Sequence, residues 1–576
     1  MSKVRINSLK VKNYRSFWEE QSFEFPWEDY KKPVAIIGYN NAWKTNLMNC
    51  ILYWIWEKFV SENTFEKHDL HNLDYKNHIL IKSQLNWSIY WQIEKYWKTY
   101  DQTIWWDYEI KTEIKDNELR SEWTSFFWKN KHYNIFYINF HKIKDEISTK
   151  KSSWWNLNSF LAKHIDKLVK EDVEMQKRKN DFKNEVENAT KKVLNWSKNN
   201  WSKLSTFIEN IKLNYQHNLR NIACEIDFWL PDYEDIFLQM MFKVWLNGEK
   251  EKLVPIDHFW DWYISMFVMA VIQAIAGEKT KDQCLFLFEE PESFLHENHQ
   301  EYFYKMVLCK LSENHQVIYT THSDKMIDIF DTRWLIRLEY NEETQQTEKK
   351  YPQEKQSLDF IEKIKEENTW LVNEIKDFNN YIKMIEPNLN KILFSKKVIL
   401  VEWPNDLLVY KYLIEQKAKN FWHDESFSKA YLNFHNIAII PHHWKATAWI
   451  LIELCKKIWL DYFVINDWDF DDETLFDSLS KYETEEEMKN WSEYISEIDS
   501  NKKWMITTNW KLINKAWKEK IHFNVKKLES LIWYNSNDKN PSKIWEKITD
   551  SSFKIDEKIF PKSLEKFLEL KQQTNL

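Results

Sequence analysis

Residues 38–45 read Gly38-Tyr39-Asn40-Asn41-Ala42-Trp43-Lys44-Thr45 and directly follow the apolar run Val34-Ala35-Ile36-Ile37. The stretch fits the phosphate-binding pattern G-x-x-x-x-G-K-[ST] except at the second glycine, where Trp43 stands. Behind it, apolar residues at 47, 51, 52 and 55 recur at helical spacing. A strand, a loop and a helix in this order let backbone N–H groups bind phosphate. The sequence therefore predicts an α/β domain with a nucleotide site at this loop.

Trp43 contradicts the pattern, because an indole would collide with the nucleotide that a glycine admits. The anomaly is general: the chain has 34 Trp and only 3 Gly, whereas a usage near 7% predicts about 40 Gly. Trp also stands at 260, 262, 403, 444 and 468, where the motifs below favour glycine. We hypothesise that most Trp letters are glycines from a genome that reads UGA as glycine. The codons of the gene decide this.

Composition limits the function classes. The net charge is −8, so any contact with nucleic acid must use a local basic groove. Five cysteines without a C-x-x-C pair indicate a reduced, cytoplasmic protein without structural zinc. The charged N-terminus does not resemble a signal peptide, and no run of 18 apolar residues predicts a membrane span. The length of 576 residues favours two to four domains.

Patterning along the chain predicts two α/β regions. Strands are expected before residue 38 and again over 78–140, with Trp105-Trp106 as a Gly-Gly turn. The charged stretch 158–219 is expected to be a helical insertion, and 356–390 a helical linker. We therefore expect domains at 1–347 (insertion at about 150–225) and 391–576, joined by a linker at 348–390.

Three further motifs follow the loop in the first region. His258-Phe-Trp260-Asp261-Trp262 precedes an apolar helix, and with glycines restored it would form a turn able to present N–H groups to phosphate. A buried strand, Cys284-Leu-Phe-Leu-Phe288, ends in the acids Glu289 and Glu290, which suit Mg²⁺ binding and activation of water. The next strand ends at His322, which is placed to sense a γ-phosphate.

The second region repeats the pattern of acids after apolar strands. Glu402 and Asp406 follow Val398–Val401, and Asp467 and Asp469 follow the strand that ends at Asn466. Because parallel strands end at one edge of a sheet, these four carboxylates are expected to converge there. They could hold one or two divalent cations for phosphodiester chemistry. A downstream lysine, Lys539 or Lys543, could neutralise the scissile phosphate.

The motif order of the first region resembles ABC-type ATPases of the RecF/SMC-related group, and Asn13-Tyr-Arg15-Ser-Phe17 resembles their first strand. The resemblance implies Mg²⁺ ligation by Thr45 and Glu289, a general base at Glu290, a switch histidine at His322 and a dimer that completes the site. The residues it assigns to ATP binding are Gly38, Asn40, Asn41, Ala42, Trp43, Lys44, Thr45, Asn46 and Asp261.

The spaced acids of the second region resemble a Toprim domain. An ABC-type ATPase followed by a C-terminal Toprim domain is similar to the OLD (overcoming lysogenization defect) family, class 2, which includes the Gabija anti-phage nuclease–ATPase subunit. The resemblance implies Mg²⁺ or Mn²⁺ at Glu402, Asp406, Asp467 and Asp469, with Glu402 and Asp467 catalytic together with Lys539 or Lys543. It also implies double-stranded DNA as substrate, a homodimer or tetramer, and a UvrD-like helicase subunit if the gene lies in a Gabija operon.

We therefore expect a nucleotide-regulated, metal-dependent DNA endonuclease of phage defence. One alternative is a RecF/SMC-like DNA-repair ATPase that clamps DNA and carries a non-catalytic Toprim domain. A second alternative takes Trp43 literally: the ATPase site is then blocked, and a binding or structural role is left. Metal-dependent cleavage of DNA separates the first two readings, and nucleotide binding tests the third.

Overall fold

The computed structural model describes residues 3–26, 28–39, 44–54, 64–73, 77–92, 99–115, 118–123, 135–143, 173–194, 243–244, 254–277, 283–331, 333–350, 383–384, 386–422, 424–470, 474–494, 500–534 and 539–570. The chain divides into two compact units, and each draws on separate parts of the sequence. Unit 1 combines Met1–Val34 with Thr45–Thr321, and unit 2 combines Ala35–Lys44 with His322–Leu576. The domain boundaries expected at 347 and 391 stay predictions.

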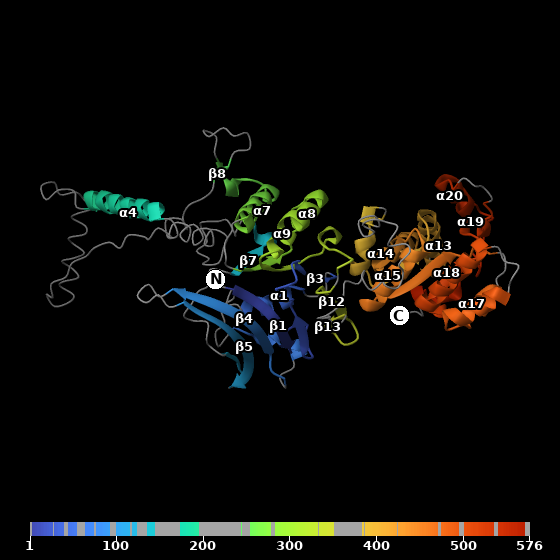
Figure 1. Ribbon diagram of the computed structural model, residues 1–576, viewed down its shortest axis with the longest axis horizontal. Helices are drawn as coiled ribbons and strands as arrows, with labels where there is room; N and C mark the ends of the chain where they lie inside the picture. Colours follow the sequence, from blue (N-terminus) through green and yellow to red (C-terminus); the bar gives the residue numbers. More distant parts are fainter. Residues whose placement is uncertain are drawn as a thin grey trace. The chain divides into compact units, whose positions relative to one another are not determined.

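Unit 1 holds a five-stranded antiparallel sheet, a parallel group of three strands, and helices (Figure 1). Its strands are β1 (Lys3–Lys12), β2 (Gln21–Glu24), β4 (Leu80–Gln92), β5 (Thr99–Lys115), β6 (Glu118–Trp123), β7 (Ile135–Asn139), β8 (Lys243–Val244), β9 (Val254–Pro255), β10 (Leu285–Glu289) and β11 (Gln316–Thr320). Its helices are α1 (Lys44–Trp54, from Thr45 onward), α4 (Val173–Leu194), α7 (Asp261–Gly277), α8 (Glu297–Phe303) and α9 (Cys309–Ser312).

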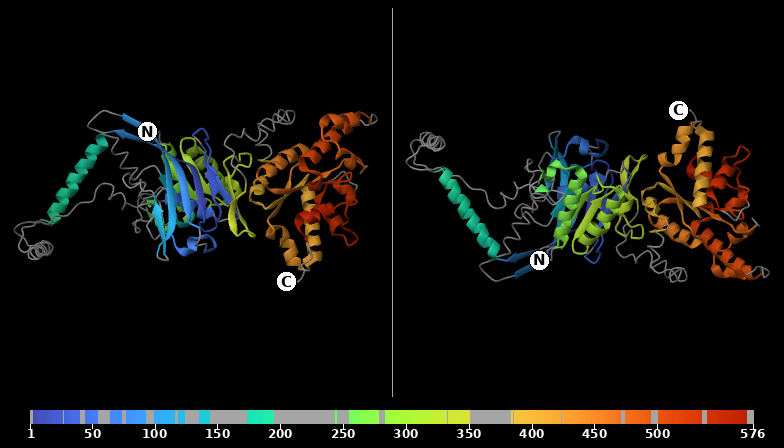
Figure 2. Two further views of the ribbon diagram at one scale, coloured as in Figure 1. Left: turned by 90° about the horizontal axis from the view of Figure 1, so that it is seen from below. Right: turned by 90° about the horizontal axis from the view of Figure 1, so that it is seen from above.

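The antiparallel sheet has the order β2-β1-β4-β5-β6, and β1, β4 and β5 run side by side in both views of Figure 2. The turn expected at Trp105-Trp106 is wrong. Both residues lie inside β5, where they pair with Asn86 and Leu85 of β4 in an uninterrupted ladder. A turn there would break that ladder, and tryptophan itself favours strands.

In the parallel group, β10 lies between β7 and β11. All five residues of β10 and of β11 are buried, as expected for parallel strands covered on both faces. The expected strands before Glu289 and before His322 are thereby confirmed. The described part of the expected insertion is α4; the rest of 158–219 lies outside the described residues, as does most of the expected linker.

Unit 2 contains the strand before the phosphate loop, β3 (Val34–Gly38, from Ala35 onward), which pairs in parallel with β12 (Ile336–Asn341); β12 pairs with β13 (Gln346–Lys349). The C-terminal region of unit 2 has the strands β14 (Lys397–Val401), β15 (Ile437–Pro441), β16 (Asp461–Asp467) and β17 (Ile521–Asn524). Its helices are α13 (Pro404–Trp422), α14 (Glu425–Phe434), α15 (Lys445–Lys457), α16 (Thr474–Leu479), α17 (Glu485–Tyr494), α18 (Ser500–Ala516), α19 (Leu528–Leu531), α20 (Pro541–Thr549) and α21 (Lys562–Leu568).

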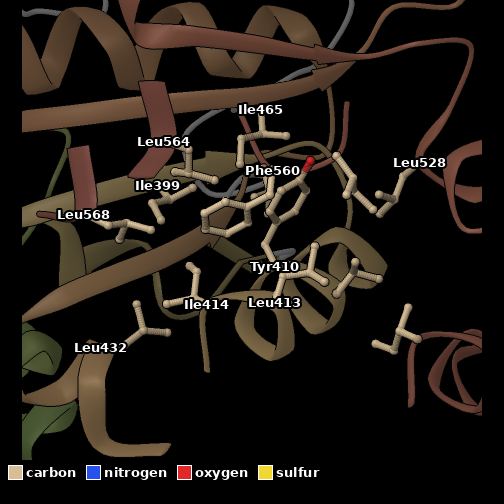
Figure 3. Packing of buried hydrophobic residues seen from close by; sticks show 14 of the residues in the cluster. Ile399, Tyr410, Leu413, Ile414, Leu432, Ile465, Leu528, Phe560, Leu564 and Leu568 are labelled. Carbon is tan, nitrogen blue, oxygen red and sulfur yellow. The ribbon is translucent and has the colours of Figure 1, made fainter. Parts of the chain in front are cut away.

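The C-terminal strands form one parallel sheet of order β15-β14-β16-β17. A buried core packs against it, in which Tyr410 of α13 lies among Ile399, Ile465 and Phe560 (Figure 3). The Tyr410 hydroxyl donates to Asn524 Oδ1 at 2.7 Å, so its burial leaves no unsatisfied donor. This core fixes the edge of the sheet at which β14 and β16 end.

Asn390 joins the segment after His322 to the entry of the C-terminal sheet. Its side-chain amide donates to the carbonyls of Asp324 (2.7 Å) and Ile327 (3.0 Å) and accepts from the Ile329 N–H at 3.3 Å. Asn390 lies in a 3₁₀ helix, Leu389–Phe394, that leads into β14. One side chain thus makes three hydrogen bonds between parts of the chain separated by about 60 residues.

Two helices of unit 2 end at tryptophans in the left-handed conformation. Trp459 has φ 52° and Trp533 has φ 57°, and both side chains are largely exposed, at 64% and 82%. The Trp459 N–H donates to Lys456 O, and the Leu460 N–H donates to Cys455 O. This is the Schellman pattern, whose left-handed position glycine usually fills, and Trp533 makes the same pair of bonds at the end of α19. A bulky residue there is an outlier.

Replacing Trp459 or Trp533 by glycine should raise the free energy of unfolding by about 1 kcal/mol each, because glycine lacks the Cβ that the left-handed conformation strains. Trp504 is a matched control: it is 60% exposed but lies inside α18. Trp504→Gly should lower the free energy of unfolding by about 0.5–1 kcal/mol. Urea denaturation measures all three, and a loss of stability in every variant would contradict the assignment.

Candidate functional site

Lys44 and His322, the expected phosphate lysine and switch histidine, lie together in unit 2. The Lys44 ammonium donates to the carbonyl of Gly38 at 3.0 Å and lies 2.7 Å from Nε2 of His322. Lys44 is buried, and its contacts with Gly38 and His322 fix the position of its ammonium group. The loop residues Asn40, Asn41, Ala42 and Trp43 lie outside the described residues.

Asn46, expected to contact nucleotide, is buried and bonded elsewhere. Its amide donates to Ser16 Oγ at 3.1 Å, and its carbonyl oxygen accepts from Arg15 at 3.3 Å. Arg15 also donates to Asp69 Oδ1 at 2.8 Å. The structure therefore uses Asn46 to anchor the N-terminal segment to α1. Thr45, the expected Mg²⁺ ligand, is exposed at the start of the same helix.

Glu289 and Glu290 meet three polar side chains from the end of β7 that the sequence analysis did not single out. Glu289 Oε2 accepts from the Tyr137 hydroxyl at 2.6 Å and from Asn139 Nδ2 at 2.9 Å. His141 Nε2 lies 2.5 Å from Glu290 Oε2. Because β7 pairs in parallel with β10, its polar end arrives beside these acids. The polar residues directly after the apolar strand 135–138 were the signal that could have found them.

Asp261, assigned to nucleotide binding by the resemblance, is the first residue of α7. The tryptophans on either side, Trp260 and Trp262, are exposed, and the Tyr263 N–H donates to Trp260 O at 2.9 Å. The motif thus forms the N-terminal turn of a helix, as expected, and unit 1 keeps both indoles at its surface.

The acids of the C-terminal sheet converge at one edge, because β14 and β16 are parallel neighbours. Glu402 Oε2 accepts from Asn466 Nδ2 and from the backbone N–H of Asp467, both at 3.0 Å. Asp467 Oδ1 accepts from the Leu528 N–H at 2.9 Å. Asp406 and Glu529 lie close enough for their charges to raise the pKa of Asp467. We call Glu402, Asp406, Asp467 and Glu529 the acidic cluster.

Burial and mutual repulsion disfavour the charged forms of the cluster. Burial, and to a lesser extent the charges of Glu402 and Glu529, raise the pKa of Asp406 to about 7, although a 2.9 Å hydrogen bond from the Trp403 N–H opposes the rise. Burial also raises the pKa of Glu402, and it raises that of Asp467 well above the usual range. A bound cation would remove this repulsion.

The donor set suits a hard cation, because Mg²⁺ and Mn²⁺ prefer carboxylate oxygens. In the part of the chain that the structure describes, however, no three His, Cys, Asp or Glu side chains are already arranged to hold a metal ion. Glu402 faces two N–H donors instead. Both donors meet Oε2, so the other carboxylate oxygen, Oε1, could bind a metal ion without breaking either bond.

Asp469, the fourth expected ligand, is bonded to a lysine. Lys445 Nζ donates to Asp469 Oδ2 at 2.6 Å. Between the two acids, Trp468 is buried and packs against Phe470, Phe476 and Phe523. An aromatic pocket thus receives the indole at a position where the motif favours glycine.

The two candidate phosphate lysines differ in their surroundings. Lys539 Nζ lies 3.6 Å from Glu529 Oε1 and 5.1 Å from the centre of the Trp403 ring. The Asn405 amide donates to the Lys539 carbonyl at 3.2 Å, which ties this segment to the start of α13. Lys543 lies one turn into α20 and is exposed. The structure therefore brings Lys539 to the acidic cluster.

Comparison with known proteins gives two partial matches. A family model described as an AAA domain matches residues 8–226, which is less than half of the chain. A protein named OLD nuclease, from Thermus scotoductus, is 23% identical over 274 residues. That match covers 46% of this chain and 45% of the relative, so the chain spans less than half the length of the curated relative that it matches. The N-terminal part is thus similar to an AAA domain.

Solved structures with similarity include heads of SMC proteins. One, derived from Pyrococcus furiosus and bound to the C-terminal domain of ScpA, is 14% identical, with 64% of this chain and 99% of that chain covered and a TM-score of 0.32. The SMC head domain from Thermotoga maritima is 13% identical, with 60% and 97% covered and a TM-score of 0.24.

Asp406 makes stability depend on pH. A carboxyl whose pKa is higher in the folded than in the unfolded chain binds its proton more tightly when folded, so stability falls as pH rises through that range. With EDTA present, Asp406→Asn should gain stability over the parent between pH 4 and 8, by up to about 4 kcal/mol. The amide still accepts from the Trp403 N–H. Urea denaturation at both pH values measures the gain; a difference independent of pH would contradict the shift.

Proposed function

We propose that the chain is a nucleotide-regulated, divalent-metal-dependent DNA endonuclease with an AAA/ABC-type ATPase domain and a C-terminal Toprim domain. The observation that carries the proposal is the acidic cluster: buried carboxylates with raised pKa values at the ends of two neighbouring parallel strands, beside Lys539. Acids whose pKa is shifted by burial together with specific charged neighbours are candidates for functional sites. The partial similarity to an OLD nuclease supports the same direction.

In this proposal Glu402, Asp406 and Asp467 would hold Mg²⁺ or Mn²⁺, which supplies charge stabilisation for phosphodiester hydrolysis. Burial keeps these carboxylates away from bulk water and strengthens their field on the site. The Asp467 backbone N–H and Asn466 orient Glu402. Lys539 is the lysine best placed to meet the scissile phosphate, and Lys543 is the alternative on α20.

The nucleotide half of the proposal assigns ATP phosphates to Lys44 and the loop before it. Lys44 and His322 lie together, so His322 could respond to a γ-phosphate held by that lysine. Tyr137 and Asn139 fix Glu289, the proposed Mg²⁺-side acid, and His141 contacts Glu290, the proposed general base. Each catalytic carboxylate thus has a partner that limits its rotation.

The wider setting is also proposed from the resemblance. It comprises double-stranded DNA as substrate, a homodimer or tetramer, anti-phage defence in the cytoplasm, and a UvrD-like helicase subunit if the operon is Gabija. Among the described residues, no helix is long and apolar enough to cross a membrane.

Glu402→Gln should lower Mn²⁺-dependent nicking of plasmid DNA by about 100-fold or more, because an amide keeps the hydrogen bonds but is a poor cation ligand. Glu415→Gln is the matched control: it lies on α13, outside the acidic cluster, and should leave nicking unchanged. A parent protein that binds DNA without cutting it under any divalent cation would favour the DNA-clamping alternative instead.

We also propose that Trp43 and most other Trp letters are glycines in the natural protein. The left-handed helix ends at Trp459 and Trp533 support this independently of any motif. Trp43→Gly should then raise ATP affinity at least about 10-fold, or 1.4 kcal/mol, because the indole no longer occupies nucleotide space. Isothermal titration calorimetry of both forms measures this, and equal affinities would refute the clash.

A further inference from the structure

Lys445 is a buried cation for which no role has yet been described. It is the first residue of α15, directly after β15, and its side chain is only 10% exposed. Its ammonium donates to Asp469 Oδ2 at 2.6 Å, to the Asp467 carbonyl at 2.8 Å and to Asn509 Oδ1 at 2.9 Å. A lysine ammonium has three N–H donors, and each has one acceptor here. Lys445 therefore has no donor left for a DNA phosphate.

Two of the three acceptors lie in the turn 467–469, and the third, Asn509, binds the same turn. Asp469 is in the left-handed conformation, with φ 65°, and its N–H donates to Lys526 O at 2.9 Å. Asn509 binds Lys445 through its oxygen and donates from Nδ2 to the Trp468 carbonyl at 2.9 Å. Lys445 and Asn509 together hold the turn 467–469 from both sides. A strained turn that directly follows a cluster residue needs such support to keep one conformation.

Lys445 also acts on the charge of the acidic cluster. Burial raises the pKa of Glu402, and the Lys445 charge is the strongest effect that opposes this rise. Asp469 contributes negative charge in the same place, and the 2.6 Å ion pair offsets it. The ion pair is largely buried, so solvent screens it less than a surface pair.

We propose that Lys445 is a positioning residue and an internal counter-cation of the acidic cluster. It neutralises Asp469 and fixes the turn 467–469, so that the divalent cation binds the cluster in one productive geometry. The inference rests on the proposed nuclease function and names a residue that its motifs do not include. The fixed positive charge of Lys445 orders the site but also weakens cation binding.

Two effects of opposite sign follow from Lys445→Met, which keeps the length of the side chain and removes its charge. Mn²⁺ should bind at least about 3-fold more tightly, because a positive charge leaves and the Asp469 carboxylate is released. The kcat for DNA cleavage should fall at least about 10-fold with KM for DNA within 2-fold, because the turn is no longer held. A folding defect would weaken both Mn²⁺ binding and cleavage.

The experiment measures Mn²⁺ affinity of the full chain by electron paramagnetic resonance and cleavage by steady-state kinetics. Lys520→Met is the matched control, because Lys520 forms a 2.6 Å ion pair with Asp461 at the opposite end of β16. It should change neither quantity. Lys445→Arg keeps the charge and should retain the parent's Mn²⁺ affinity, which covers the case in which Lys445→Met fails to fold.

Unchanged or weaker Mn²⁺ binding in Lys445→Met would overturn the inference, as would unchanged kcat. A raised KM for DNA with normal kcat would make Lys445 a phosphate-binding residue and would overturn it as well. If the parent protein does not cleave DNA, the proposed function fails, whereas the Mn²⁺ measurements still decide the role of Lys445.

Discussion

Glu402, Asp406, Asp467 and Glu529 bring four carboxyl groups together at the carboxyl edge of the C-terminal sheet, where Asp406 and Asp467 are buried and water screens them little. Their repulsion is tolerated because the parallel strands, the α13 core and backbone N–H donors hold them in place. A folded chain can keep such a group only if packing elsewhere offsets its cost. The surrounding structure therefore holds carboxyl groups whose charged forms burial disfavours and a bound cation would favour.

Two lysines offset the negative charge of the acidic cluster in different ways. Lys445 is buried and has all its donors occupied, whereas Lys539 is half exposed and lies at the rim beside Glu529. Burying a lysine costs desolvation free energy, which is offset only where its ammonium group is fully hydrogen-bonded. An exposed lysine can change partners. The first lysine suits a fixed scaffold, and the second suits an interaction made with a substrate.

The sequence predicted where the buried strands end better than it predicted the side-chain contacts between distant segments. Apolar runs that end in acids located β10, β14 and β16, because buried parallel strands carry a continuous apolar signal. Lys445 and Asn509 were missed as partners of the Asp469 turn, since 24 and 40 residues separate them from Asp469 and no local pattern links them. The turn predicted at Trp105-Trp106 was wrong because the low glycine count is a property of the whole chain. It does not identify a turn at any one pair of tryptophans. Trp468 shows the same limit, because an aromatic pocket can receive an indole where a motif favours glycine.

The hydrogen bonds of Asn390 have a consequence for how the chain can be divided. The segment after His322 and the entry to β14 are joined by a side chain, in addition to the backbone that runs through residues 351–382. Lys383, which follows that stretch, adds a 2.6 Å ion pair to Asp328, which precedes it. A cut within 351–382 would therefore remove the covalent link but leave these hydrogen bonds and this ion pair between the two fragments.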